Sequence, residues 1–195
     1  MSKQKKLDSA GKEAFVNAVL AMLDEGLSLR ELNLRKVARR VGCAHTNAYN
    51  YFESFEDLLW WSLKGALERM VDAAGAGEGD LIGSYIDFAQ KHPTWYRLIW
   101  LDPLSGFPPD QVAAYLPVPG QVLTQWIAKI TGGSDSGAGD RIRILHGYLH
   151  GELAAITAGR VTGKPAELKD RVVSGARMLF KMLFNMDYTE GVKDK

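Results

Sequence analysis

Apolar residues recur at helical spacing along most of the chain, and no segment alternates apolar and polar residues as a half-buried strand does. The first segment shows this most clearly, with apolar residues at i, i+4, i+7 and i+8, namely Phe15, Val19, Met22 and Leu23. These positions share one face of a helix, which Gly26 ends. The pattern therefore predicts an all-α fold.

The start of each early helix is marked by a capping residue. Asp8 or Ser9 can cap the first helix after a charged tail of residues 1–6, and Asn33 can cap the second. Further helices are predicted over residues 44–50, 54–73, 81–90, 93–101, 110–129, 140–158 and 166–184.

Glycine and proline mark the breaks between the later helices. Residues 73–80 and 131–139 are rich in glycine and are predicted to form loops. Pro117 and Pro119 interrupt the 110–129 segment, and proline removes a helical hydrogen bond, so that segment is predicted in two pieces.

Residues 33–51 have the form of a helix-turn-helix, with a short apolar-faced helix, a turn at Gly42 and a second short helix. Basic residues gather in the same stretch. Between positions 30 and 50 only Glu31 is acidic, whereas five residues are basic: Arg30, Arg35, Lys36, Arg39 and Arg40. Because the whole chain carries a net charge of only +1, this local excess is what a phosphate-binding surface needs.

The segment 34–59, LRKVARRVGCAHTNAYNYFESFEDLL, and the helix end at 24–26 resemble the tetracycline-repressor (TetR) family of bacterial transcription regulators. The resemblance covers residues 8–60 and rests on the spacing of Ala38, Gly42, Tyr49, Phe52 and Leu58. It implies a three-helix DNA-binding domain over residues 1–53 and a larger helical domain over 54–195 that binds an effector and dimerises.

The resemblance implies a ligand-responsive regulator, a repressor that binds palindromic operator DNA as a homodimer and is not an enzyme. DNA contacts are expected at the start of the first motif helix and along the second: Asn33, Arg35, Lys36, His45, Thr46, Asn47, Tyr49, Asn50 and Tyr51. Phe55 stands where the family usually has a phosphate-binding lysine. That difference leaves open a TetR-like protein that does not bind DNA.

Aromatic residues are frequent between Trp60 and Trp126, with few charges among them. Such a set can line a largely apolar pocket, so the expected effector is a small apolar or aromatic molecule. The residues expected to contact it are Trp61, Tyr85, Trp95, Trp100 and Trp126.

Small residues form a stripe along the 140–158 helix, which lets another helix approach closely. Together with the apolar face of the last helix, the stripe predicts a four-helix interface between two copies of the chain. The interface residues expected are His146, His150, Ala155, Leu179, Phe180 and Leu183.

His146 and His150 are four residues apart, so a second hypothesis is a helical metal-binding protein or enzyme that uses this pair with Glu152. No set of nucleophile, base and orienting residue supports catalysis, and neither a metal nor a cofactor is expected. The single cysteine, Cys43, excludes a disulfide framework within the chain. With no signal segment and no long apolar run, we expect a cytoplasmic protein without a membrane partner.

Overall fold

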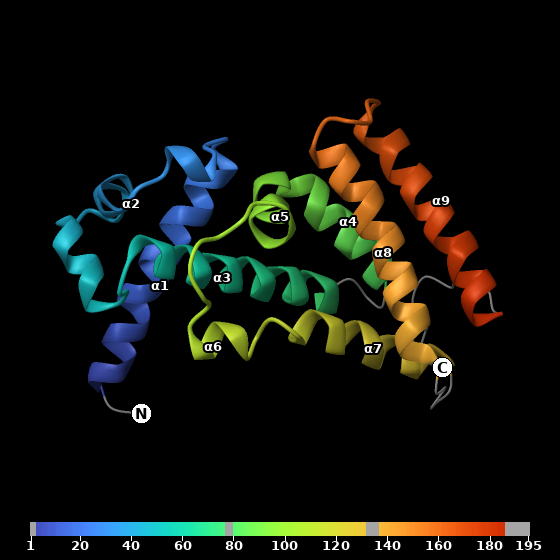
Figure 1. Ribbon diagram of the computed structural model, residues 1–195, viewed down its shortest axis with the longest axis horizontal. Helices are drawn as coiled ribbons and strands as arrows, with labels where there is room; N and C mark the ends of the chain where they lie inside the picture. Colours follow the sequence, from blue (N-terminus) through green and yellow to red (C-terminus); the bar gives the residue numbers. More distant parts are fainter. Residues whose placement is uncertain (1–2, 77–79, 132–136, 186–195) are drawn as a thin grey trace. The chain divides into compact units, whose positions relative to one another are not determined.

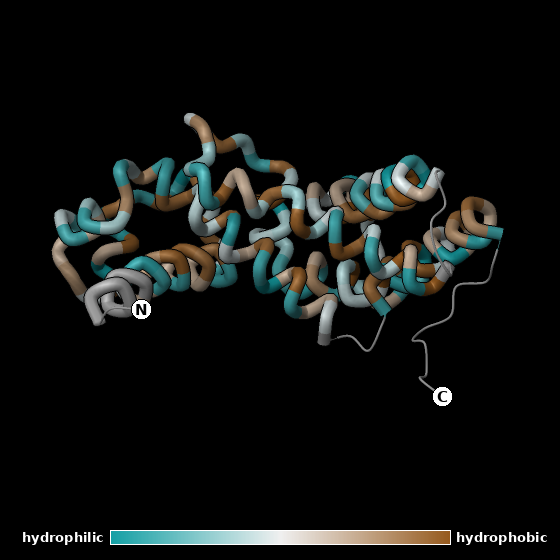
Figure 2. Tube along the Cα trace, turned by 90° about the horizontal axis from the view of Figure 1, so that it is seen from below, coloured by the Kyte–Doolittle hydropathy of each residue, from teal (hydrophilic) through white to brown (hydrophobic). Residues whose placement is uncertain are grey.

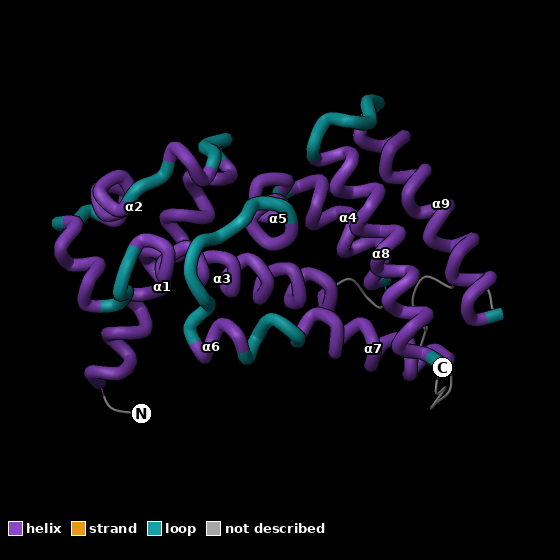
Figure 3. Tube along the Cα trace, viewed as in Figure 1, coloured by secondary structure: helices purple, strands orange, loops and turns teal. Residues whose placement is uncertain are grey.

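The computed structural model describes residues 3–76, 80–131 and 137–185, and these residues form helices and loops without strands (Figure 1, Figure 3). The predicted all-α fold is therefore confirmed. The α-helices are α1 (Lys3–Asp24), α2 (Leu34–Val41), α3 (Phe55–Ala76), α4 (Leu81–Lys91), α5 (Pro93–Trp100), α6 (Asp110–Ala113), α7 (Val118–Thr131), α8 (Ala138–Thr157) and α9 (Pro165–Phe184). Two 3-10 helices, η1 (Leu29–Glu31) and η2 (His45–Asn50), flank α2.

Hydrophobic and hydrophilic residues are interspersed along the helices, as Figure 2 shows. This is the pattern of helices that bury one face and expose the other. None of the helices in the described part of the chain has the length and apolar character of a membrane span.

Contacts within the chain divide it into two compact units. The first comprises Met1–Glu68 and Thr94–Leu116, and the second comprises Arg69–Pro93 and Pro117–Lys195. The functional division expected after residue 53 stays a prediction, because it concerns where DNA and an effector bind and the units are defined by packing.

In the first unit, both ends of α2 are fixed by local chemistry. The side-chain oxygen of Asn33 accepts a hydrogen bond of 3.0 Å from the backbone N–H of Lys36, which caps α2. Gly42 follows α2 with a φ of 83°, in the left-handed region that glycine adopts without strain. The predicted cap and the predicted turn residue are both confirmed.

The core of the first unit joins α1 to α2 and η2. Phe15 of α1 is 2% exposed, and its ring centre lies 5.9 Å from that of Phe52 and 6.0 Å from that of Tyr51. Tyr51 also lies against Gly11, where a side chain would collide with its hydroxyl and ring carbons. The chain that follows η2 is thereby held against α1.

In the second unit, α8 and α9 pack side by side and run antiparallel (Figure 1). Arg171 of α9 donates a hydrogen bond of 2.8 Å to Glu152 of α8, and Tyr148 lies against Gly175. Helix α4 joins α9 through the Lys169 ammonium, which donates to the Asp87 carboxylate at 2.6 Å. The packed helices bury Ile82, Ile86, Leu145, Leu149, Leu153, Val172, Ala176 and Phe180.

Two boundary predictions at the ends of helices were wrong. Helix α1 begins at Lys3 rather than after residue 6, because Lys and Gln are good helix formers that extend a nucleated helix at little cost. Helix α3 continues to Ala76 although a loop was predicted from residue 73, since one glycine costs a helix only about 1 kcal/mol.

The two-piece prediction for residues 110–129 is confirmed by α6 and α7, which are separated at Pro117. The bounds of the loop predicted over residues 131–139 were wrong, because α7 includes Thr131 and α8 begins at Ala138. The part of that loop over residues 132–136 lies outside the described residues.

The Asn33 cap can be tested by its stability. Replacing Asn33 with Ala removes the acceptor for the Lys36 N–H and should lower the free energy of unfolding by about 1 kcal/mol, whereas Asn33→Ser keeps an acceptor and should stay close to the wild type. Urea unfolding followed by circular dichroism measures both. Equal stability of all three proteins would show that the cap contributes nothing.

Candidate functional site

The segment η2 exposes its polar side chains and buries a small apolar one. His45, Thr46, Asn47 and Asn50 are exposed, as is Tyr49, whose exposed fraction is 58%. Ala48 is fully buried, so it anchors the segment while its neighbours face outward. Hydroxyl, amide and imidazole groups both donate and accept hydrogen bonds, which is what base edges and phosphates require.

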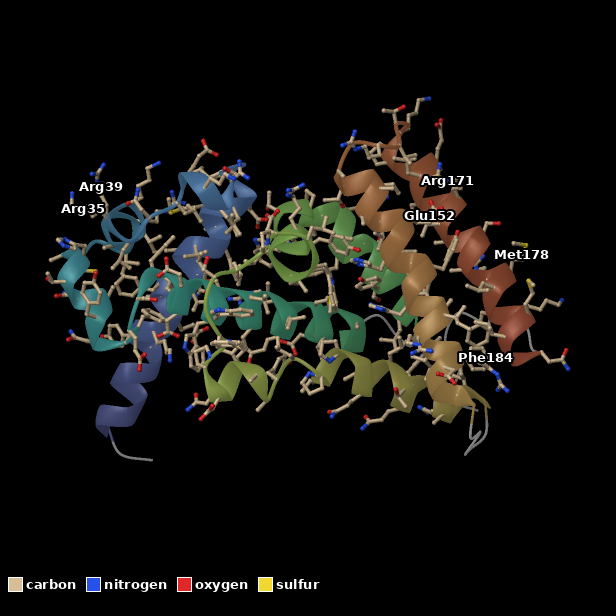
Figure 4. All side chains as sticks on the ribbon, viewed as in Figure 1. Arg35, Arg39, Glu152, Arg171, Met178 and Phe184 are labelled. Carbon is tan, nitrogen blue, oxygen red and sulfur yellow. The ribbon has the colours of Figure 1, made fainter. Side chains whose placement is uncertain are left out.

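Two arginines beside this segment have no ion-pair partner among the described residues. Arg35 and Arg39 lie one turn apart on α2, and both are exposed. Neither side chain makes a hydrogen bond or an ion pair with any other described residue, and Figure 4 shows both side chains extending outward from α2. Their positive charge is therefore available to an anionic partner. The DNA contacts expected from the sequence include Arg35 but not Arg39. The four-residue spacing of the two arginines, which places them on the same face of a helix, would have pointed to Arg39 as well.

The other basic residues of α2 are held by the protein. The Arg40 guanidinium pairs with the Glu25 carboxylate, with one nitrogen–oxygen distance of 3.1 Å. The Lys36 ammonium donates a hydrogen bond of 2.6 Å to the backbone carbonyl of Glu31. These contacts and the Asn33 cap show that part of the expected DNA-binding set also shapes α2.

Glu31 is the one acidic residue within the basic stretch. Its carboxylate accepts hydrogen bonds from the backbone N–H and the hydroxyl of Ser28, at 2.9 and 2.7 Å. These two bonds hold the pKa of Glu31 below its usual range, so the group stays charged. The charged carboxylate of Glu31 therefore stabilises the turn before α2 through its hydrogen bonds with Ser28.

Tyr51 belongs to the residues expected to contact DNA, and it is half-buried against Gly11, Phe15 and Phe52. Its ring therefore supports the end of η2. Gly11 was not singled out from the sequence, because only the folded chain reveals that a distant ring lies on that helix position.

In the second unit, α8 and α9 present apolar residues on their outer faces. Ile144 of α8 is 50% exposed, and Gly147 and Gly151 are exposed on the same face. Met178 and Met182 of α9 are 65% and 73% exposed. Both faces border the seam where Tyr148 packs on Gly175, and we call them together the α8–α9 outer face.

The interface residues expected from the sequence differ in their burial, and the interface itself stays a prediction. Phe180 is fully buried within the unit, and Leu179, Leu183 and Ala155 are half-buried.

No family model and no curated protein sequence matches the chain. Solved structures do match it. A TetR-family transcriptional regulator from Streptomyces coelicolor is 17% identical with a TM-score of 0.70, and the match covers 94% of this chain and 83% of that one. A protein of unknown function from Rhodococcus sp. RHA1 is 19% identical with a TM-score of 0.69, over 87% and 95% of the two chains.

A third solved structure that matches the chain is also a TetR regulator. A TetR transcriptional regulator from Rhodococcus sp. RHA1 is 15% identical with a TM-score of 0.56, over 90% and 97% of the two chains. The chain has the TetR fold. Because the matches extend over nearly the whole chain, the TetR fold includes the helices beyond residue 60, which the sequence resemblance did not reach.

Within the TetR fold, the aromatic residues expected to contact an effector divide between the two units. Trp61, Trp95 and Trp100 belong to the first unit, and Tyr85 and Trp126 belong to the second. The Tyr85 ring centre lies 6.0 Å from that of His146, and the Trp126 ring centre lies 6.3 Å from that of Phe180.

Trp61 makes a cation–π contact with Lys12. The Lys12 ammonium lies 3.2 Å from the centre of the Trp61 ring, which links α1 to α3. Burial lowers the pKa of Lys12 and the nearby Lys64 charge adds to that, whereas the Asp57 carboxylate opposes it. Trp61 thus has a packing role in addition to any contact with an effector.

Trp95 is 8% exposed, and its indole N–H donates a hydrogen bond of 2.9 Å to the backbone carbonyl of Leu20. Trp95→Phe removes that donor and leaves a cavity, so the free energy of unfolding should fall by roughly 1–3 kcal/mol. Trp60→Phe is the matched control, because Trp60 makes the same kind of bond to Ser105 at an exposed site. Thermal unfolding should separate the two variants, and equal losses would contradict the structural role of Trp95.

Proposed function

We propose that the chain is a transcriptional regulator that binds double-stranded operator DNA through α2 and η2. The observation that carries the proposal is the exposed polar segment His45–Asn50 next to Arg35 and Arg39, two cations without a counter-charge among the described residues. The TetR fold supports the same role, since the solved structures that share it include transcriptional regulators.

The chemistry assigns different tasks to the two elements. Arg35 and Arg39 neutralise backbone phosphates, which supplies affinity without sequence information. His45, Thr46, Asn47 and Asn50 are short polar side chains on η2, the kind that reads base edges in the major groove. Tyr49 adds a hydroxyl at an exposed position. Asn33, Lys36 and Tyr51 complete the proposed DNA-binding set.

We propose that two copies of the chain associate through the α8–α9 outer face. Exposed methionine and isoleucine side chains beside glycines favour a close helix contact that removes this apolar surface from water. Glu152 and Arg171 pair at the seam and keep their charges satisfied next to it. A two-fold dimer presents two copies of η2, so its operator is palindromic.

The proposed response is to a small apolar or aromatic effector, which lowers DNA affinity and makes the protein a repressor. Two half-buried aromatic residues in each unit support it, Trp61 and Trp100 in the first and Tyr85 and Trp126 in the second. Trp95 supports it less, because it is buried and hydrogen-bonded. The effector acts through a coupling free energy of about 1–3 kcal/mol between its site and the DNA site.

The DNA interface is tested with a duplex selected from a random-sequence pool by the purified chain. Arg35→Ala combined with Arg39→Ala should weaken binding and lower the slope of log K against log salt by about 1.8, because two phosphates lose their partners. Arg143→Ala with Arg160→Ala removes the same charge from exposed positions of the second unit and should leave the slope unchanged. Fluorescence anisotropy at several salt concentrations measures both.

Equal slopes for the two double variants would place the phosphate contacts elsewhere. Failure of the selection to enrich any duplex would instead favour a TetR-like protein that does not bind DNA.

The dimer is tested by sedimentation at micromolar concentration. Met178→Glu with Met182→Glu should convert dimers to monomers, because each carboxylate would be buried without a partner. Both residues are exposed within one chain, so the fold of the monomer should survive. Ala113→Glu with Ala128→Glu adds the same charge at exposed positions of α6 and α7 and should leave the dimer intact. A wild-type chain that sediments as a monomer would contradict the proposal.

A further inference from the structure

His146 and His150 occupy successive turns of α8, and their ring centres lie 6.1 Å apart with an angle of 16° between the ring planes. Both are half-buried. Their side of α8 differs from the sides that Ile144 and Tyr148 occupy, so the pair faces neither the α8–α9 outer face nor α9. Tyr85 of α4 lies beside His146. The pair is therefore separate from the proposed DNA and dimer surfaces.

Burial lowers the pKa of His146, and the neighbouring His150 lowers it further. Burial also lowers the pKa of His150. An imidazole nitrogen that carries no proton has the lone pair that binds a metal ion. The two rings lie nearly parallel, with an angle of 16° between their planes.

The spacing of the rings suits a shared ion. With metal–nitrogen bonds of about 2.0–2.1 Å, two imidazole centres bound to one tetrahedral ion lie roughly 5 Å apart. The observed 6.1 Å requires the rings to approach by about 1 Å and to turn about χ2, a torsion with a broad low-energy range. No change in the helix is needed, because residues four apart lie on the same face.

We propose that His146 and His150 form a two-histidine site for a divalent transition ion of the kind that imidazole prefers, such as Cu²⁺ or Zn²⁺. Among the described residues, no third His, Cys, Asp or Glu completes a cluster with them. Glu152, the partner considered from the sequence, instead accepts a hydrogen bond from Arg171. The remaining coordination positions are therefore open to water or to oxygen donors of a small molecule.

The site is tested on the full chain without a polyhistidine tag, after removal of metal with a chelator. Isothermal titration with CuCl₂ or ZnCl₂ at neutral pH should show one ion bound per chain. His150→Gln should weaken binding by at least about tenfold, because a single imidazole does not chelate. His92→Gln is the matched control, since His92 lies beside Phe88 of α4 and is not a member of the pair, and it should leave the affinity unchanged.

Electron paramagnetic resonance of the Cu²⁺-loaded wild-type chain gives a second test that needs no variant, and two imidazole nitrogens should bind the ion. One nitrogen, no bound ion, or an affinity that His150→Gln leaves unchanged would overturn the proposal. None of these results depends on DNA binding, so the site and the proposed regulatory function stand or fall separately.

Discussion

The packing of Tyr51 and Phe52 against Gly11 and Phe15 of α1 is the contact on which the candidate DNA surface depends. It fixes the chain at the end of η2, while the buried Ala48 fixes its middle. A short 3-10 helix has too few internal hydrogen bonds to hold itself in water. The polar residues of η2 therefore keep one arrangement, because Ala48 within the segment and Tyr51 and Phe52 after it are packed against the rest of the protein.

The charged residues around α2 fall into two groups, those with partners in the protein and those without partners among the described residues. Arg40 and Lys36 satisfy acceptors of the protein itself, and Glu31 is occupied by Ser28. Arg35 and Arg39 remain without protein partners among the described residues. A chain with almost no net charge can thus present a local cationic surface, because Glu25 is paired with Arg40 and Glu31 with Ser28, which leaves the charges of Arg35 and Arg39 uncompensated by those carboxylates.

Much of the fold could be predicted from the sequence, since its signals are local. Asn33 and Gly42 mark the ends of α2 by side-chain and backbone chemistry that needs no distant partner. The role of Gly11 and the burial of Phe180 could not be predicted, because both depend on residues brought together only by folding. Likewise, Arg35, Lys36, Arg39 and Arg40 look equivalent in sequence, and only their partners distinguish them.

The central claim is that η2 reads the major groove. Methylation protection of a selected duplex tests it most directly, because guanine N7 lies in the major groove and adenine N3 in the minor groove. The account predicts protection of N7 positions in two half-sites centred one helical turn, about 10 base pairs, or a multiple of it apart. It also predicts that Asn47→Ala changes which N7 positions are protected. Protection confined to adenine N3, or a pattern that Asn47→Ala leaves unchanged, would contradict it.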